Sequence, residues 1–277
     1  MIEENPLVKD IIRLSLLEDI GPGDITTSLL IKEDFQVQAR LIAKEKFLLA
    51  GISIFKQVFR ELSSSVSFEE FFQDGDLVEK DAIICKINGS ISVILKAERT
   101  ALNFLQRMSG IATMTKRFVD EVSHTKVRIL DTRKTAPGMR ILDKYAVRVG
   151  GGYNHRLGLF DGILIKDNHI AAVGSIKKAI ELAKKQAPHT LKIEVEVENI
   201  EQLVEAIEAG ADIVLLDNME FEQIREAVRL AKGKVLIEVS GGVRLEDVRR
   251  IAELGVDFIS IGALTHSVKG VDISLEI

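Results

Sequence analysis

The chain has a single cysteine among its 277 residues, and this scarcity excludes a whole class of folds. With Cys85 alone, no disulfide can form within the chain, so the protein is not a scaffold held together by disulfides. One cysteine also fits a reducing compartment, and we expect a cytoplasmic protein. Cys85 follows the apolar residues Ile83 and Ile84, which favours a place in the core over a role as a nucleophile.

The sequence also lacks a long apolar run and an excess of basic charge. No apolar stretch approaches the roughly 20 residues that a membrane-spanning helix requires. The N-terminal segment is acidic and amphipathic, without the basic and apolar regions of a secretory signal. The formal charge is -5, whereas a protein that binds nucleic acid is expected to present a broad basic surface. We therefore expect neither a membrane nor a nucleic acid as a partner.

The second half of the chain alternates short apolar runs with amphipathic segments. Strands are expected at Arg128–Leu130, Gly162–Ile165, Lys192–Val197, Asp212–Leu216, Val235–Val239 and Asp257–Ile261. Helical patterns follow at Ser175–Gln186, Ile200–Ala209, Glu220–Ala231 and Leu245–Leu254. Continuous apolar strands that alternate with helices indicate a parallel sheet covered by helices. This pattern fits a (β/α) barrel, and an open doubly wound sheet would give the same local signal.

The N-terminal part has a different pattern. We expect strands at 39–43 and 68–72, and a helix at 53–61. Residues 73–95 have a strand–turn–strand rhythm, with turn signals at Asp74-Gly75 and Asn88-Gly89. A long amphipathic helix is expected from Lys96 to Val122, broken or bent at Gly110.

Segment 131–169 concentrates positive charge within an acidic chain. Its cations are Arg133, Lys134, Arg140, Lys144, Arg148, Arg156 and Lys166, accompanied by His155 and His169. A single such residue would most simply be a solvated surface charge. Here the charges are interleaved with glycines and histidines in a loop, and arginine is suited to a bidentate grip on carboxylates and phosphates. The segment therefore predicts a receptor for a small polyanion.

Carboxylates and glycines follow the other predicted strands, where a barrel places its active site. Glu196 and Asp217, with Glu194 as a third, would lie near the phosphate-binding cations, a usual setting for Mg²⁺. Pairing of Glu194 or Glu196 with lysines is the structural alternative. Glycine segments 239–243 and 260–267 could hold a phosphate through main-chain N–H groups, and the role of His266 stays open.

Several motifs together resemble one enzyme family over nearly the whole length. They are EDIGPGDIT at 18–26, AKEKFLLAGI at 43–52, ERTALNFLQRMSGIAT at 98–113, DTRKTAPGMR at 131–140, KYAVRVGGGYNHRLGLFDGILIKDNHI at 144–170, EVEVEN at 194–199, LLDN at 215–218, EVSGGV at 238–243 and SIGALTHSVKGVDISLEI at 260–277. In this combination the chain resembles the quinolinate phosphoribosyltransferases.

The resemblance implies an α/β fold with two domains. Residues 1–110, with the tail 268–277, would form an N-terminal α/β sandwich, and 111–267 an open seven-stranded α/β barrel. The C-terminal tail would return to the first domain. The implied enzyme is a Mg²⁺-dependent pentosyltransferase that joins quinolinate to phosphoribosyl pyrophosphate. Its products would be nicotinate mononucleotide, pyrophosphate and CO₂, in de novo NAD biosynthesis. It would work as a homodimer with shared active sites, and further assembly into hexamers is left open.

The resemblance also implies roles for particular residues. Quinolinate would be held by Arg99 of a partner copy together with Arg133, His155, Arg156 and Lys166. Phosphoribosyl pyrophosphate would be held by Lys134, Glu196, Asp217, Ser240, Gly241, Gly242, Gly262, Ala263 and Leu264. Thr132 would be a further substrate-binding residue. The residues closest to the chemistry would be Lys134, Lys166, Glu196 and Asp217, and the two carboxylates would hold Mg²⁺ through substrate or water.

Two other functions are compatible with a chain of this kind. One is a related phosphoribosyltransferase that acts on another aromatic acid, such as nicotinate, or a molybdenum-operon relative. The presence of Arg99, Arg133, Arg156 and Lys166 together argues against it, because such an enzyme has less need to grip a second carboxylate. The other is a catalytically silent phosphate-ligand sensor, which the complete set of metal-type carboxylates disfavours.

Overall fold

The computed structural model describes residues 2–277, which divide into two compact units. The first unit comprises residues 2–116, 135–151 and 264–277, and the second comprises 117–134 and 152–263. The sequence places 135–151 in the barrel domain, whereas in the structure this segment packs within the first unit.

The first unit is built on a four-stranded antiparallel sheet. Its strands, in the order β12-β1-β5-β3, are β12 (Ile273–Glu276), β1 (Gln36–Ala43), β5 (Ile83–Ser90) and β3 (Ser67–Glu70). A separate two-stranded sheet joins β2 (Phe47–Leu48) to β4 (Leu77–Val78). Pairing of Leu41 with Leu275 confirms that the C-terminal tail returns to the first unit.

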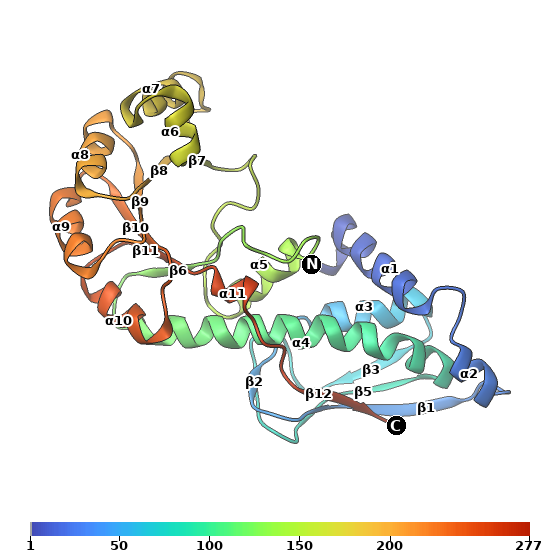
Figure 1. Ribbon diagram of the computed structural model, residues 1–277. Coiled ribbons are helices and arrows are strands. Elements are labelled where there is room, and N and C mark those ends of the chain that lie inside the picture. Colours follow the sequence, from blue (N-terminus) through green and yellow to red (C-terminus); the bar gives the residue numbers. More distant parts are fainter. Residues whose placement is uncertain (1) are drawn as a thin grey trace. The chain divides into compact units, whose positions relative to one another are not determined.

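Helices cover one face of this sheet. They include α3 (Ile52–Leu62) and the long α4 (Ile91–Glu121), which lie along the same face in Figure 1. Phe55 and Phe59 of α3 are fully buried, with their ring centroids 5.1 Å apart. The unit also contains η1 (Ile2–Glu4), α1 (Pro6–Ile20), α2 (Ile25–Leu30), α5 (Arg140–Val149) and α11 (Ala263–His266), the last beginning at the boundary of the second unit.

Two expectations for the first unit are wrong. Asn88 and Gly89 lie inside β5, and the chain passes directly from β5 into α4 at Ile91. The helix is also not broken at Gly110 but continues to Glu121. A side chain at Gly110 would meet the main-chain oxygen of Lys269 at 2.3 Å, so the glycine permits close approach of the C-terminal segment.

Two polar contacts hold α5 within the first unit. Asp143 of α5 is fully buried and accepts hydrogen bonds from Arg107 Nε at 2.9 Å and Nη2 at 2.8 Å. The hydroxyl of Tyr145 donates to Asp74 at 2.7 Å. These contacts join α5 to α4 and to the turn at 74–75, which explains why 135–151 packs with this unit.

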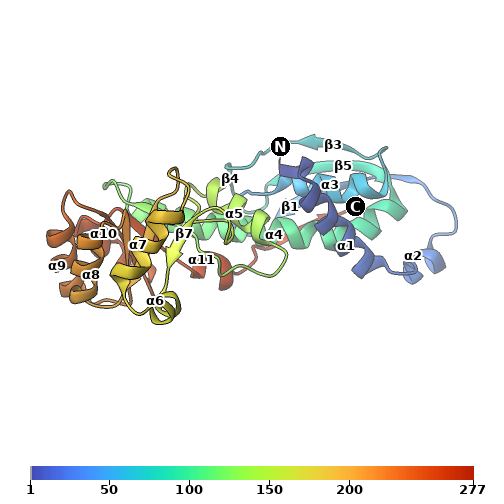
Figure 2. The same cartoon turned by 90° about the horizontal axis from the view of Figure 1, so that it is seen from above.

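The second unit is a parallel sheet with helices on its outer side. The strand order is β6-β11-β10-β9-β8-β7, with bounds β6 (Arg128–Leu130), β7 (Ile163–Ile165), β8 (Ile193–Val197), β9 (Ile213–Asp217), β10 (Leu236–Ser240) and β11 (Phe258–Ser260). The helices are α6 (Asp167–Val173), α7 (Ile176–Gln186), α8 (Ile200–Ala209), α9 (Phe221–Ala231) and α10 (Leu245–Glu253), which follow the outside of the strands (Figures 1 and 2). Each predicted strand and helix is present, with ends shifted by at most one residue.

The predicted barrel is confirmed with one difference in strand number. Six strands are regular, and the seventh position is taken by Tyr153, which makes an isolated parallel bridge to Leu130 on the free side of β6. The Tyr153 bridge lies at one edge of the sheet and β7 at the other. The linear strand order does not join these two edges, so the barrel is open between them. Within residues 2–277, no helix combines the length and the apolar character that crossing a membrane would require.

Candidate active site

The alternation of side chains along the parallel strands defines an inner face with polar residues. In β8, Val195 and Val197 are fully buried, and Glu194 and Glu196 occupy the alternate positions. The same alternation in β10 places Glu238 and Ser240 on this inner face, since successive side chains point to opposite sides of a sheet. The helices occupy the outer side, so the polar residues collect inside the curved sheet.

The loop that carries His155 is anchored to the end of β6. Asp131 directly follows this strand and is fully buried. Its carboxylate accepts hydrogen bonds from Asn154 Nδ2 at 2.6 Å and from the main-chain N–H of His155 at 2.8 Å. Main-chain bonds between Tyr153 and residues 129 and 131 complete the attachment. The position of His155 is therefore set by β6.

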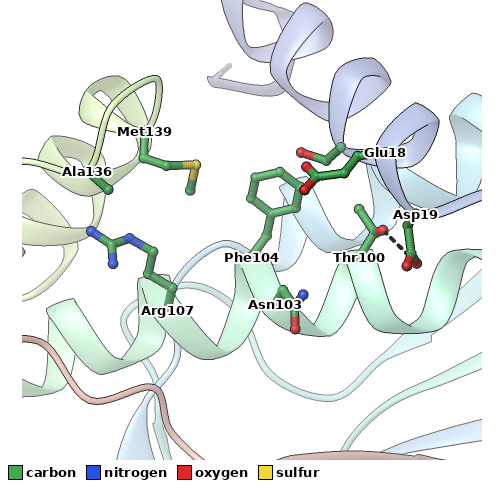
Figure 3. A pocket seen from close by; sticks show the side chains of 9 residues that line it. Glu18, Asp19, Thr100, Asn103, Phe104, Arg107, Ala136 and Met139 are labelled. Atoms are coloured by element: carbon green, nitrogen blue, oxygen red, sulfur yellow. Dashed lines mark hydrogen bonds between the residues drawn. The ribbon is translucent and has the colours of Figure 1, made fainter.

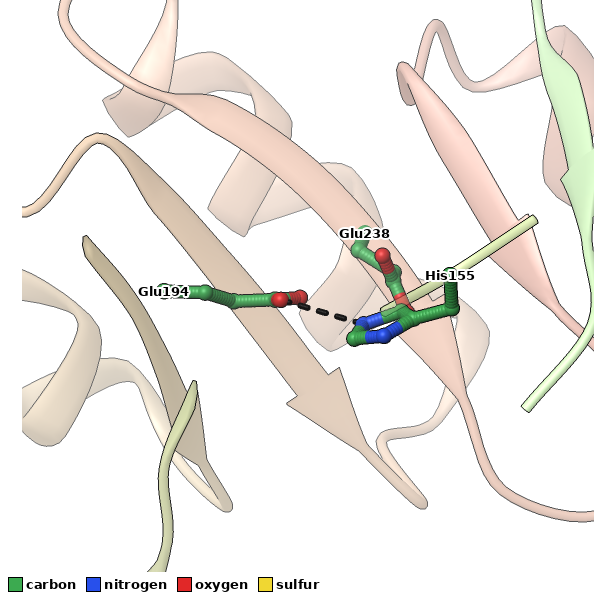
Figure 4. Close-up of side chains that lie close together, drawn as sticks. All are labelled: His155, Glu194 and Glu238. Carbon is green, nitrogen blue, oxygen red and sulfur yellow. Dashed lines mark ion pairs between the residues drawn. The ribbon is translucent and has the colours of Figure 1, made fainter. Parts of the chain in front are cut away.

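His155 reaches two buried glutamates that come from different strands. Its Nε2 lies 3.1 Å from Glu194 Oε2 and 3.7 Å from Glu238 Oε1 (Figure 4). Burial, and next the nearby Glu194 carboxylate, raise the pKa of Glu238 to about 8. The three ligand-type atoms lie within 4.8 Å of one another.

Arg156 follows His155 and is half-buried. Its Nη1 donates to the carbonyl oxygen of Gly162 at 3.1 Å, whereas its buried Nε has no hydrogen-bond partner. Burial, and next the charge of Arg133, lower the pKa of its guanidinium. A buried donor on a cation, close to a second cation, is suited to an incoming anion.

The end of β7 supplies a lysine to the same inner face. Lys166 forms an ion pair and hydrogen bond with Glu196 of β8, so the predicted alternative of carboxylate–lysine pairing holds for Glu196. Glu194 pairs with His155 instead. His169 accepts from the Lys166 main-chain N–H at 2.9 Å and caps α6, which gives it a local structural role.

A pocket of about 450 Å³ opens where β9 and β10 end. Its lining includes Asn218, Ser240, Gly241 and Gly242, with Arg244 and Asp247 from the start of α10. Asp217 lies level with Ser240 in the paired strands, and Gly241 has a φ of +96°. The predicted phosphate-binding residues Gly241 and Gly242 thus line a pocket, which also includes Val239, Ile224 and Ile251 and does not include Asp217.

The other predicted residues occupy several environments. Thr132 accepts through its hydroxyl from the main-chain N–H of Lys134 at 3.0 Å, and Lys134 is exposed. Gly262 and Ala263 follow β11, and the Leu264 side chain is fully buried, which leaves its main chain for any ligand contact. The exposed Arg99 lies on α4 and belongs to the first unit. His266 is exposed and hydrogen-bonded to Ser267.

A different pocket, of about 520 Å³, lies in the first unit (Figure 3). Glu18 and Asp19 from α1 line it together with Phe104 and Arg107 from α4 and Met139. Thr100 donates to Asp19 at 3.4 Å. These residues differ from the predicted substrate-binding set.

Glu238 and Asp131 were not expected to shape the site. A glutamate within the apolar run 235–239 gives the same signal as Glu194 within its own strand, and it could have pointed to Glu238. Asp131 directly follows the predicted strand Arg128–Leu130, and its role in holding His155 depends on a hydrogen bond that the sequence does not show.

Comparison with known proteins covers the chain almost completely. Profiles described as quinolinate phosphoribosyl transferase, N-terminal domain and C-terminal domain, match residues 24–109 and 111–276. A probable nicotinate-nucleotide pyrophosphorylase (carboxylating) from Bacillus subtilis (strain 168) is 45% identical over 270 residues, which is 98% of this chain and 93% of that protein. A chloroplastic protein of that name from Arabidopsis thaliana is 43% identical, covering 98% of this chain and 82% of its own length.

Solved structures agree with these matches. The nicotinate-nucleotide pyrophosphorylase from Francisella tularensis has a TM-score of 0.94 and 45% identity, over 100% of this chain and 98% of that one. NadC from Streptococcus pyogenes has a TM-score of 0.93 and 43% identity, over 98% and 95%. The chain therefore belongs to the quinolinate phosphoribosyltransferase family and is an enzyme of that class.

Proposed function

We propose that this enzyme transfers the phosphoribosyl group from phosphoribosyl pyrophosphate to the ring nitrogen of quinolinate. Pyrophosphate leaves from the ribose C1 in this step. The adjacent carboxylate is then lost as CO₂, and a proton takes its place on the ring carbon, which yields nicotinate mononucleotide. The observation that carries the proposal is the inner face of the second unit. There Arg156 presents a buried donor close to the charge of Arg133, and Lys166 is paired with Glu196.

The cations suit a planar dianion. Arg133, Arg156 and Lys166 bind the two carboxylates and turn the ring nitrogen toward the ribose C1. Their positive charge offsets the negative charge of the substrate. Positioning of this kind accounts for a large part of the rate of such a reaction, because the nucleophile needs no proton removed. Arg99 of a partner copy completes the grip.

The second substrate is assigned to the neighbouring strand ends. Gly241, Gly242 and Ser240 bind its phosphate through main-chain N–H groups and a hydroxyl, with Gly262, Ala263 and the main chain of Leu264 doing the same after β11. Thr132 and Lys134 take the pyrophosphate. Glu196 and Asp217 hold the ribose hydroxyls and offset positive charge that develops on the ribose as pyrophosphate departs.

The oxygen donors fit Mg²⁺. Glu196 and Asp217 are carboxylates in the neighbouring parallel strands β8 and β9, which is the hard-oxygen chemistry that Mg²⁺ prefers. Held there through substrate or water, the ion would neutralise charge on the leaving pyrophosphate.

A homodimer in the cytoplasm is part of the proposal. Large apolar side chains are exposed on the first two helices: Leu14 at 65% and Leu17 at 66% on α1, and Leu29 at 64% on α2. Exposed apolar side chains of this kind suit contact with a second copy. Mixing inactive Arg99→Ala and Lys166→Ala subunits should restore about a quarter of wild-type activity if sites are shared, since half of the dimers are mixed and carry one intact site. No restoration would exclude sharing.

The proposed reaction is tested with carboxyl-labelled quinolinate, phosphoribosyl pyrophosphate and Mg²⁺. Release of labelled CO₂ together with nicotinate mononucleotide is expected, and it should cease when Mg²⁺ is chelated. A nicotinate-specific relative would form nucleotide from nicotinate alone, and a sensor would release nothing; either result would refute the proposal. Arg133→Ala should lower turnover sharply, and His124→Ala, which removes an exposed histidine paired with Glu253, serves as the matched control.

A further inference from the structure

His155 is held at three points. Its main-chain N–H donates to the fully buried Asp131 at 2.8 Å. Its ring Nδ1 accepts from the main-chain N–H of Arg156 at 2.8 Å. Its Nε2 faces Glu194 Oε2 at 3.1 Å (Figure 4). Few side chains at a substrate site are fixed at the main chain and at both ends of the ring.

These contacts determine where the imidazole carries its proton. A nitrogen that accepts a hydrogen bond cannot also carry a proton, so Nδ1 is the unprotonated nitrogen of the ring. Nε2 then carries the proton, and this N–H donates a hydrogen bond to the Glu194 carboxylate. The hydrogen bonds therefore assign the neutral Nε2–H tautomer, with the Nε2 donor directed toward two buried glutamates.

The charges around the ring can be balanced without a positive imidazole. Glu194 and Glu238 have side chains only 8% and 2% exposed, so two negative charges at this distance would be costly. Burial, and next the Glu194 carboxylate, raise the pKa of Glu238 to about 8, so Glu238 keeps its proton at neutral pH and Glu194 is the charged member of the pair. Glu194 also acts on the Arg156 guanidinium, whose charge it favours. Glu194 thus accepts a hydrogen bond from the imidazole and balances the charge of Arg156, and Glu238 is hydrogen-bonded to the Ser260 side chain.

We propose that His155 is a positioning residue, which as a neutral imidazole ties the Arg156 main chain to the buried Glu194 and so fixes the Arg156 guanidinium. The substrate part of this inference rests on the proposed function. His155 then does not supply a positive charge to a quinolinate carboxylate. It determines where Arg156, held at its other end by Gly162, presents its buried Nε donor.

The tautomer can be measured without any substrate. In protein labelled with ¹⁵N at its five histidines, the His155 signals are identified by their loss in His155→Leu. At neutral pH, Nδ1 should have the shift of an unprotonated nitrogen and Nε2 that of a protonated one. Two protonated nitrogens, or a proton on Nδ1, would overturn the proposal. This result does not depend on which reaction the enzyme catalyses.

A double-mutant cycle tests whether His155 acts through Arg156. We expect His155→Leu to weaken quinolinate binding about 10²-fold, because a displaced guanidinium loses its aligned contacts. On this mechanism His155→Leu/Arg156→Ala binds no more weakly than Arg156→Ala alone. Additive losses would mean that His155 contacts substrate itself and would refute the assignment. Calorimetry gives the dissociation constants, and wild-type protein that fails to bind quinolinate would overturn the proposed function, leaving the tautomer result intact.

A conservative variant separates positioning from simple loss of structure. In His155→Asn the amide oxygen can still accept from the Arg156 N–H, so its quinolinate KM should lie much nearer to wild type than that of His155→Leu. The KM for phosphoribosyl pyrophosphate should be unchanged in both. Equal losses in the two variants, or an equal rise in both KM values, would contradict the proposal. His124→Ala should match wild type throughout, and circular dichroism checks that every variant is folded.

Discussion

The pair formed by Arg107 and Asp143 should be the most sensitive ion pair of the first unit. Asp143 is fully buried, and Arg107 gives it two hydrogen bonds, at 2.9 and 2.8 Å, from a side chain that is 26% exposed. The same guanidinium donates to the carbonyl oxygen of Thr265 at 3.0 Å, so it joins α4 to both α5 and α11. Arg107→Ala would leave a carboxylate buried without its counter-charge.

The expected loss can be worked out from these contacts. Breaking a buried pair by removing one partner costs about 3–5 kcal/mol. Water can reach the vacated space because Arg107 is partly exposed, so the lower end, about 3 kcal/mol, is expected. The control is the pair of Arg13, which is 60% exposed, and Glu61, which is 15% exposed, with N and O 3.0 Å apart. No charge there is fully buried, so Arg13→Ala should cost less than about 1 kcal/mol.

Two measurements check this prediction. Urea unfolding followed by circular dichroism gives the free energy of unfolding, and hydrogen exchange should show the protection lost first in α5 and α11. Arg107→Met/Asp143→Leu should recover much of the loss, because replacing both members leaves no buried charge. A loss below about 1 kcal/mol in Arg107→Ala, or unchanged exchange in α5, would refute the reasoning.

Three further predictions concern single residues. The folded state keeps the Glu238 proton up to a pKa of about 8, whereas the unfolded state releases it near 4.5. The free energy of unfolding should therefore fall as pH rises between these values, by at most about 1.4 kcal/mol per pH unit. Urea unfolding of Glu238→Gln should show a smaller fall with pH, and an equal slope in the two proteins would contradict this prediction. Burial, and next Glu70, raise the pKa of the Cys85 thiol to about 12, so a thiol reagent should label it in urea but not in native protein, and rapid native labelling would count against it. In Gly241→Ala the new Cβ would meet Asn218 Oδ1 at 2.2 Å, so calorimetry should show phosphoribosyl pyrophosphate binding weakened about tenfold or more and quinolinate binding unchanged. The control is Gly233→Ala, because Gly233 also has a positive φ but has open space around it. Equal effects of the two substitutions would exclude the clash as the cause.

The parallel sheet could be predicted because its signals are local. Each strand is a short apolar run, and the helix after it begins at a capping residue such as Asn199, whose side chain accepts from the Gln202 N–H, and can end at a glycine such as Gly210. The start of α4 could not be read in this way. Residues 91–95 are an apolar, β-branched run typical of a strand, yet Ile91, Ile94 and Ala97 are buried at a helical spacing in the structure.

The sequence predicts which residues lie at the strand ends, and so which residues can reach the site. It does not predict which of these residues contact one another. Arg133 and Lys166 follow strands and Asp217 is the last residue of one, and the carboxyl ends of parallel strands share one edge. The partners of these residues depend on curvature of the sheet and on burial. Glu194 and Glu196 are two residues apart and chemically identical, yet one binds a neutral histidine and the other a lysine. No local pattern separates them.

The same limit explains why a histidine is easily misread from sequence. His155 precedes Arg156 in a cationic segment, so a positive charge is the natural expectation. In the structure Nδ1 accepts a hydrogen bond from the next residue, and Glu194, from a strand nearly forty positions later, faces Nε2. Each contact determines the proton at one nitrogen, and together they favour the neutral ring. The charge state of this side chain is thus a property of the folded barrel, and the anion-binding charge there comes from Arg156.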